Sequence, residues 1–173
     1  MKNQVLEALE SRRSIRSYTD QPVEAELLEA ILRAGTFAPT AMGRQDPIIV
    51  AVSDAEATAA LRRLGGELRG TPEKDPYYAA PVILAVFAPD TYLGNQDGCA
   101  VTMNLLHAAN ALGLGACWIN RAREIFQTEE GRALQAQWGL PADYTGITTV
   151  ALGHIAAAPA APKARKEGYI IRI

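Results

Sequence analysis

Three short apolar runs, set between segments with helical features, limit the fold more than any other feature of the sequence. The runs occupy residues 48–52, 81–87 and 148–155 and are rich in Val, Ile and Thr. Continuous apolar runs of this length are typical of strands buried on both faces. Apolar spacing and terminal signals predict helices at residues 22–35, 53–68, 97–112 and 128–138. The alternation predicts an α+β fold with α/β-like character.

The remaining segments complete a single domain over residues 1–173, with no internal repeat and no linker. Val5, Leu6 and Leu9 predict a first short helix that ends near Ser11. A loop at 37–47, a short strand or turn at 116–119, an extended tail at 156–166 and a strand-like end at 168–173 are also expected.

The overall charge argues against broad polyanionic partners. The formal net charge is −2, so we expect no nucleic-acid surface and no membrane surface. The sequence also has no apolar run long enough for a transmembrane helix, and its first residues do not resemble a signal peptide. Cys99 and Cys117 form no C-x-x-C pair, which favours a cytoplasmic location.

Several familiar catalytic motifs are absent from the sequence. Gly113-Leu-Gly115 follows a predicted helix rather than a strand and lacks a third glycine, so it does not predict a dinucleotide-binding loop. His107 and His154 lack the spacing of a zinc-binding helix, and we expect no metal site.

Two basic clusters lie about 150 residues apart. The first contains Arg12, Arg13 and Arg16 with Ser14 among them, and the second contains Lys163, Arg165 and Lys166. Such clusters are often solvated surface charges, but guanidinium groups also bind phosphate through paired hydrogen bonds. The residues alone leave both interpretations open. The small residues of the 37–47 loop similarly suit either a surface turn or a close approach to a flat ligand.

Four segments together resemble the nitroreductase family of FMN-dependent NAD(P)H oxidoreductases. They are RRSIRSY with the following PVEAELLEAIL, then APTAMGRQ, then AANALGLGACWI, and finally VALGHI followed by PKAR. The resemblance implies a nitroreductase-type fold, with a central mixed β-sheet flanked by helices. It also implies a homodimer that exchanges C-terminal strands.

The resemblance further implies which residues bind FMN. Arg12, Ser14, Lys163 and Arg165 would hold the phosphate with Arg13 beside them, and Arg16 would reach toward the pyrimidine side of the ring. The partner subunit would supply Pro39, Thr40, Ala41 and Gly43. Trp118, Ile119, Asn120 and Arg121 would lie along the isoalloxazine edge.

The activity implied by the resemblance is a ping-pong cycle in which NADH or NADPH reduces FMN, which then reduces a nitroaromatic or quinone. The flavin would carry the chemistry, and no catalytic side chain is assigned. The chain departs from the family pattern at Gly43, where an asparagine is common, and at Gln45-Asp46-Pro47, where Gln-Pro-Trp is common. Two alternatives remain at this stage: a specialised dehalogenase or dehydrogenase of the same family, and a flavin-binding or phosphate-binding module without turnover.

Overall fold

A four-stranded antiparallel sheet divides the helices into two layers. The computed structural model describes residues 3–173. Its strands are β1 (Ile48–Val52), β2 (Val82–Pro89), β3 (Gly115–Ile119) and β4 (Tyr144–Gly153), in the order β1-β2-β4-β3. Every neighbouring pair is antiparallel, so the expected mixed character is confined to one isolated parallel bridge, between Ser14 and Ala116.

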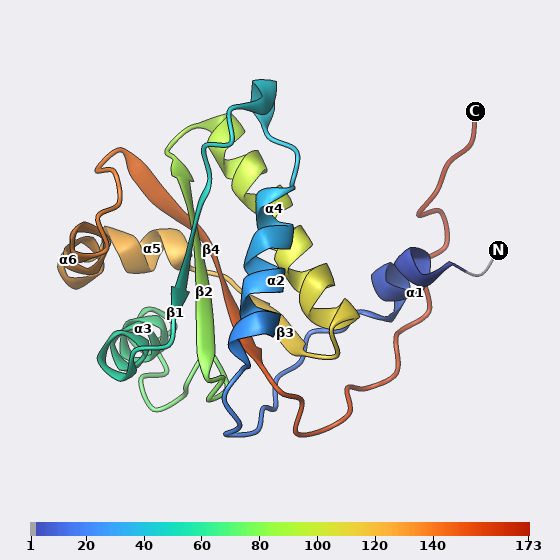
Figure 1. Ribbon diagram of the computed structural model, residues 1–173, viewed down its shortest axis with the longest axis horizontal. Coiled ribbons are helices and arrows are strands. Elements are labelled where there is room, and N and C mark those ends of the chain that lie inside the picture. Colours follow the sequence, from blue (N-terminus) through green and yellow to red (C-terminus); the bar gives the residue numbers. More distant parts are fainter. Residues whose placement is uncertain (1–2) are drawn as a thin grey trace.

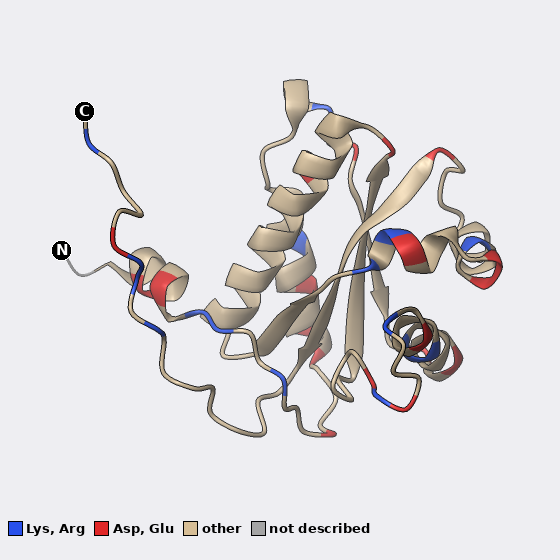
Figure 2. Ribbon diagram, turned by 180° about the vertical axis from the view of Figure 1, so that it is seen from behind, with Lys and Arg blue, Asp and Glu red and all other residues tan. Residues whose placement is uncertain are grey.

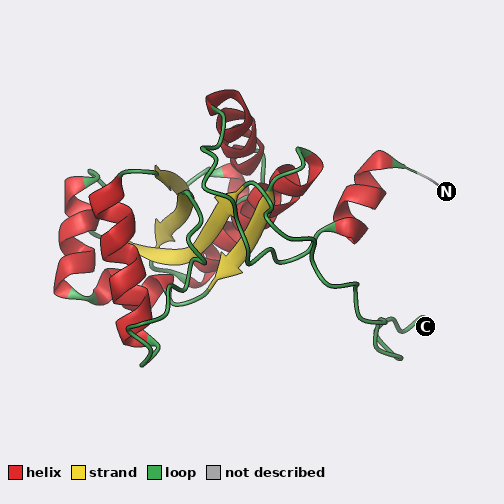
Figure 3. Cartoon of the chain, turned by 90° about the horizontal axis from the view of Figure 1, so that it is seen from below, coloured by secondary structure: helices red, strands yellow, loops and turns green. Residues whose placement is uncertain are grey.

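Alternation along the central strands gives the sheet two apolar faces. Helices α2 (Ala25–Thr36) and α4 (Tyr92–Ala111) cover one face (Figures 1 and 3). Helices α3 (Ala55–Leu68), α5 (Ala122–Gln127) and α6 (Glu129–Gln137) cover the other. On β2, Val82, Leu84 and Val86 belong to the first core, and Ile83, Ala85 and Phe87 belong to the second. This double burial explains why β2 is a continuous apolar run.

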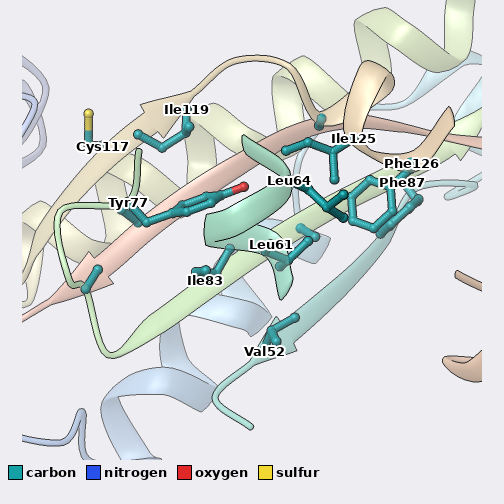
Figure 4. Packing of buried hydrophobic residues seen from close by; sticks show 14 residues of the cluster. Val52, Leu61, Leu64, Tyr77, Ile83, Phe87, Cys117, Ile119, Ile125 and Phe126 are labelled. Atoms are coloured by element: carbon teal, nitrogen blue, oxygen red, sulfur yellow. The ribbon is translucent and has the colours of Figure 1, made fainter. Parts of the chain in front are cut away.

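The core on the α3 and α5 side is built around aromatic side chains (Figure 4). The rings of Phe87 and Phe126 meet edge to face with centroids 4.6 Å apart. Tyr77 is fully buried, and its hydroxyl accepts a hydrogen bond of 3.1 Å from Thr149. Burial raises the pKa of Tyr77 to about 12, so its phenol stays protonated inside the core.

Helix boundaries differ from the expectations where side-chain capping decides them. Helix α4 begins at Tyr92 rather than near residue 97, because Thr91 caps its N-terminus through the Gly94 N–H. Helix α3 is capped by Asp54, which accepts from the Ala57 N–H, and not by Ser53 as the spacing to Glu56 predicts. Helix α5 was not predicted, since six residues are too few to show a helical period.

Two segments extend away from the layered body. Helix α1 (Gln4–Ser11) buries none of its residues, and the chain after Ile155 forms no helix or strand (Figure 1). The strand expected at 168–173 is therefore not formed within this chain, and Ile171 is 82% exposed. Across residues 3–173, no helix combines the length and the apolar character that crossing a membrane requires.

Candidate functional site

The RRSIRSY segment runs alongside strand β3. The Ile15 N–H donates a hydrogen bond of 3.1 Å to the Ala116 carbonyl, and Ser14 bridges Ala116 in parallel. Ile15 is buried at 5% exposure, whereas Ser14 is half-buried and Arg16 is exposed. This alternation matches an extended segment in which Ile15 faces the core and Arg16 faces solvent.

The arginines of this segment differ in how their donors are used. Arg13 Nη1 donates to the carbonyls of Glu10 and Arg12, each at 2.7 Å, and so closes the C-terminal end of α1. Arg12 Nε is buried and finds no hydrogen-bond partner among residues 3–173. A buried guanidinium donor without a partner is costly, so Arg12 is suited to receive an acceptor from a ligand.

The structure brings Arg12 and Arg13 of the first basic cluster together with the second cluster, although about 150 residues separate them in sequence. A hollow of about 640 Å³ lies between α1 and the tail. Its lining consists of Leu9, Glu10, Arg12, Arg13, Pro162, Lys163, Ala164 and Arg165, and we call it the basic hollow. Figure 2 shows both basic stretches, on the chain leaving α1 and on the tail.

The cations of the basic hollow are not neutralised by acidic side chains. In the described part of the chain, none of Arg12, Arg13, Lys163 and Arg165 lies within 4.0 Å of a carboxylate. Four cations and one carboxylate, that of Glu10, line this hollow, and the excess of positive charge favours an anionic ligand such as a phosphate. The donor set and the unpartnered Arg12 Nε therefore fit the phosphate of FMN.

Cys117 of β3 lies near the same arginines but within the core. Burial raises the pKa of its thiol, while Arg16, a hydrogen bond with Ser14, and Arg12 act in the opposite direction. The thiol therefore stays neutral, and it does not have the character of a nucleophile. Within residues 3–173, no three His, Cys, Asp or Glu side chains gather in a way that could hold a metal ion.

Trp118 and Ile119 are the last two residues of β3, and Asn120 and Arg121 form the turn that leads to α5. Trp118 Nε1 donates to Asn120 Oδ1 at 2.8 Å, and Ile119 is buried. Arg121 has φ 82°, a left-handed conformation that is rare for a residue with a side chain. Such strained positions often occur at functional sites.

The 37–47 loop lies at the other end of α4 (Figure 1). Its short 3-10 helix η1 (Ala41–Gly43) is attached near the start of α4 by Asp97, whose carboxylate accepts from the Ala41 N–H. Asn110, near the end of α4, contacts α1 at the Ala8 carbonyl. At 1.5 Å per residue, the helix from Asp97 to Asn110 spans roughly 20 Å. Within one chain, Pro39, Thr40, Ala41 and Gly43 are thus not brought together with the basic hollow.

Asp97 is a residue that the sequence reasoning missed. It is the one acidic residue of α4 and directly precedes the small and apolar residues 98–101, which was the available signal. A carboxylate at such a position is buried only with a specific partner.

These features define an α+β domain with a predominantly basic hollow between its first helix and its C-terminal tail. The model of the Nitroreductase family matches residues 9–154, so this chain belongs to that family. A Bacteroides fragilis nitroreductase solved with bound FMN superposes with a TM-score of 0.91 at 30% identity, covering 99% of this chain and 100% of that one.

Two relatives known by sequence match over most of this chain. A Methanothermobacter thermautotrophicus protein is 31% identical over 169 residues, which are 91% of this chain and 81% of its own length. Its name provisionally assigns it NADH dehydrogenase or NAD(P)H nitroreductase activity. An NADPH-flavin oxidoreductase of Vibrio harveyi is 26% identical over 163 residues, which are 88% of this chain and 66% of its own length.

Proposed function

We propose that this chain is an FMN-dependent oxidoreductase that takes electrons from NADH or NADPH. The observation that carries the proposal is the basic hollow, where two remote segments bring together cations that form no ion pair within residues 3–173. The FMN-bound Bacteroides fragilis relative and the flavin oxidoreductase of Vibrio harveyi support this choice of cofactor and donor.

The residues of the chain bind and orient the flavin in this proposal. Arg12, Lys163 and Arg165 neutralise the phosphate, and Ser14 adds a hydroxyl donor. Arg16, which points away from the core, serves the pyrimidine side of the ring. The backbone N–H groups of Asn120 and Arg121 face the ring edge. Bound FMN supplies the chemistry itself, because its ring can accept a hydride and pass electrons on.

The reaction that we infer is a ping-pong cycle. NADH or NADPH and then a nitroaromatic or quinone occupy the same face of the site in turn. No side chain near the basic hollow is arranged as an acid-base pair, so the protein's part is positioning and electrostatics. The unpaired thiols Cys99 and Cys117 agree with the cytoplasmic location that we infer.

The working form that we propose is a homodimer in which each flavin contacts both subunits. Helix α1 leaves Val5 66% exposed, and the apolar tail from Tyr169 to Ile173 has no cover within the chain. Strand β1 is an outer strand with one free edge, while the outer edge of β3 is bridged at Ser14. In this proposal the tail of the partner subunit pairs with β1, which buries the apolar side chains of the tail.

An absorbance scan followed by addition of reduced nicotinamide tests the proposed function. We expect purified protein reconstituted with FMN to show flavin bands that bleach anaerobically with NADH or NADPH and return with a quinone. Persistent bands would favour a binding module without turnover. A protein that takes up no FMN would exclude the proposal.

A further inference from the structure

The 37–47 loop adopts an unusual backbone conformation beside α4. Met42, Gly43 and Gln45 all have positive φ, at 55°, 63° and 57°. Glycine adopts this region freely, but Met42 and Gln45 do so at a cost in free energy. The loop therefore keeps its shape only if other contacts hold it.

Asp97 provides the contact that holds the start of this loop. Its two carboxylate oxygens lie 3.0 and 3.1 Å from the Ala41 nitrogen, so they share one N–H donor. Asp97 is 8% exposed, and in the part of the chain that the structure describes it forms no ion pair. A buried carboxylate binds such a donor strongly because water does not compete for it.

The end of the loop is held in other ways. Thr40 Oγ1 accepts from the Gln45 N–H at 3.0 Å, and Tyr144 donates its hydroxyl proton to the Asp46 carbonyl at 3.0 Å. These contacts close the loop on itself and tie its end to β4. Asp97 is the side chain that fixes Ala41 relative to α4.

We propose that Asp97 is a positioning residue for flavin binding, which acts by holding Ala41 and its neighbours in the conformation that contacts the ring. This inference rests on the proposed function, which assigns Thr40, Ala41 and Gly43 to the flavin. Without Asp97, the loop populates other conformations, and flavin affinity falls in proportion to the fraction that remains competent.

The first test measures hydrogen exchange of the Ala41 amide in the full chain without flavin. In the wild type this amide is protected, because it donates to a buried carboxylate. Asp97→Ala removes the acceptor, and exchange rises about 10-fold or more. Asp97→Asn keeps an acceptor oxygen and restores part of the protection. An unprotected Ala41 amide in the wild type overturns the proposal without any variant, even if Asp97→Ala does not fold.

The second test compares FMN with riboflavin, which lacks the phosphate. Because the loop is assigned to the ring, Asp97→Ala weakens both ligands by the same factor, about 10-fold or more, and Asp97→Asn recovers most of the loss. Asp54→Ala is the matched control, since it removes a carboxylate that accepts one backbone N–H on the other side of the sheet. This control lowers stability and leaves both flavin affinities unchanged.

The outcomes separate the role of Asp97 from the proposed function. A wild type that binds neither flavin contradicts the proposed function. A wild type that binds both, with unchanged affinities in Asp97→Ala, overturns only the positioning role. Loss of FMN affinity with unchanged riboflavin affinity also overturns it, because Asp97 would then act at the phosphate end.

Discussion

Arg12 and Arg13 are adjacent in the sequence, but their guanidinium groups differ in their hydrogen-bond partners. Arg13 closes the end of α1 through two backbone carbonyls, whereas Arg12 Nε is buried without a partner among residues 3–173. Two adjacent arginines of identical chemistry thus have different tasks. The family resemblance assigned Arg12 to the phosphate and placed Arg13 beside it, but it gave no role to Arg13, because that role depends on the path of the backbone after Ser11.

Arg12→Gln should weaken FMN binding by about 1.5–3 kcal/mol, the worth of a charged hydrogen bond, and Arg165→Gln should do the same. Riboflavin affinity should hardly change in either variant, because riboflavin has no phosphate to lose. Calorimetric titration of both ligands measures the difference. Equal affinity of the wild type for FMN and riboflavin would refute the phosphate assignment.

Arg16 should tune the flavin rather than bind its phosphate. At about 4 Å and an effective dielectric near 20, a guanidinium stabilises added negative charge by at most about 4 kcal/mol, and by less here because Arg16 is exposed. Arg16→Gln should therefore retain FMN but lower its midpoint potential. A spectroelectrochemical titration checks this, with Arg12→Gln as the control whose bound flavin keeps the wild-type potential. An unchanged midpoint potential in Arg16→Gln would mean that Arg16 binds the phosphate or is only a solvated surface charge.

His107 should make stability depend on pH. Burial, and secondarily Arg12, lower its pKa in the folded chain below the usual value of 6.5. As the pH falls below about 6.5, the unfolded chain binds the proton first, so protonation favours unfolding. Stability from this group is complete above that pH and is lost below it.

Urea denaturation at about pH 7.5 and about pH 5.5 measures this effect. The midpoint of the wild type should drop at the lower pH, and the midpoint of His107→Gln should drop less. The same drop in both proteins would show that other groups are responsible.

Among the helices and strands, the sequence predicted those whose formation depends on the local spacing of apolar residues. The buried runs at 48–52 and 81–87 became β1 and most of β2, and the apolar stripe of 22–35 became α2. The sequence-based prediction failed where contacts between residues far apart in the sequence determine the structure. Tyr77 lies in the segment 70–78, whose polar residues and two prolines predict an exposed connection. The side chain is nevertheless fully buried, and Thr149 of β4 donates a hydrogen bond to its hydroxyl. The order and the antiparallel pairing of the strands likewise result from tertiary packing, and the β-propensities of the residues do not predict them.

The same distinction applies to the candidate site. Charge clusters and the 37–47 loop were visible as patterns, and the structure places part of the first basic cluster, Arg12 and Arg13, in one hollow with Lys163 and Arg165. Asp97 was not recognised, because its importance depends on which backbone N–H lies opposite it.

The final six residues should act between chains. Removing residues 168–173 retains Lys163 and Arg165, so any loss is separate from the phosphate site. We expect the truncated protein to dissociate at higher concentrations than the full chain, because a paired apolar strand is lost. Sedimentation equilibrium measures this, and Arg172→Ser serves as a control that leaves the apolar side chains in place. Identical association of truncated and full-length protein would contradict strand exchange.

For the whole molecule, the separation of the two halves of the site along α4 has a genetic consequence. The basic hollow and the 37–47 loop lie at opposite ends of a helix segment of roughly 20 Å, so two subunits would each contribute a different half. Defects in the two halves should then complement one another. A hybrid of one Arg12→Gln subunit and one Asp97→Ala subunit would gather both lesions in one site and leave the other site intact.

Coexpression of the two variants with different affinity tags isolates that hybrid. It should bind one FMN per dimer with wild-type affinity, although each parent homodimer binds FMN weakly at both sites. If both halves came from the same subunit, every site of the hybrid would carry one lesion, and no tight site would appear. One tightly bound FMN per hybrid dimer would therefore show intragenic complementation. It would mean that each flavin site is built from two chains.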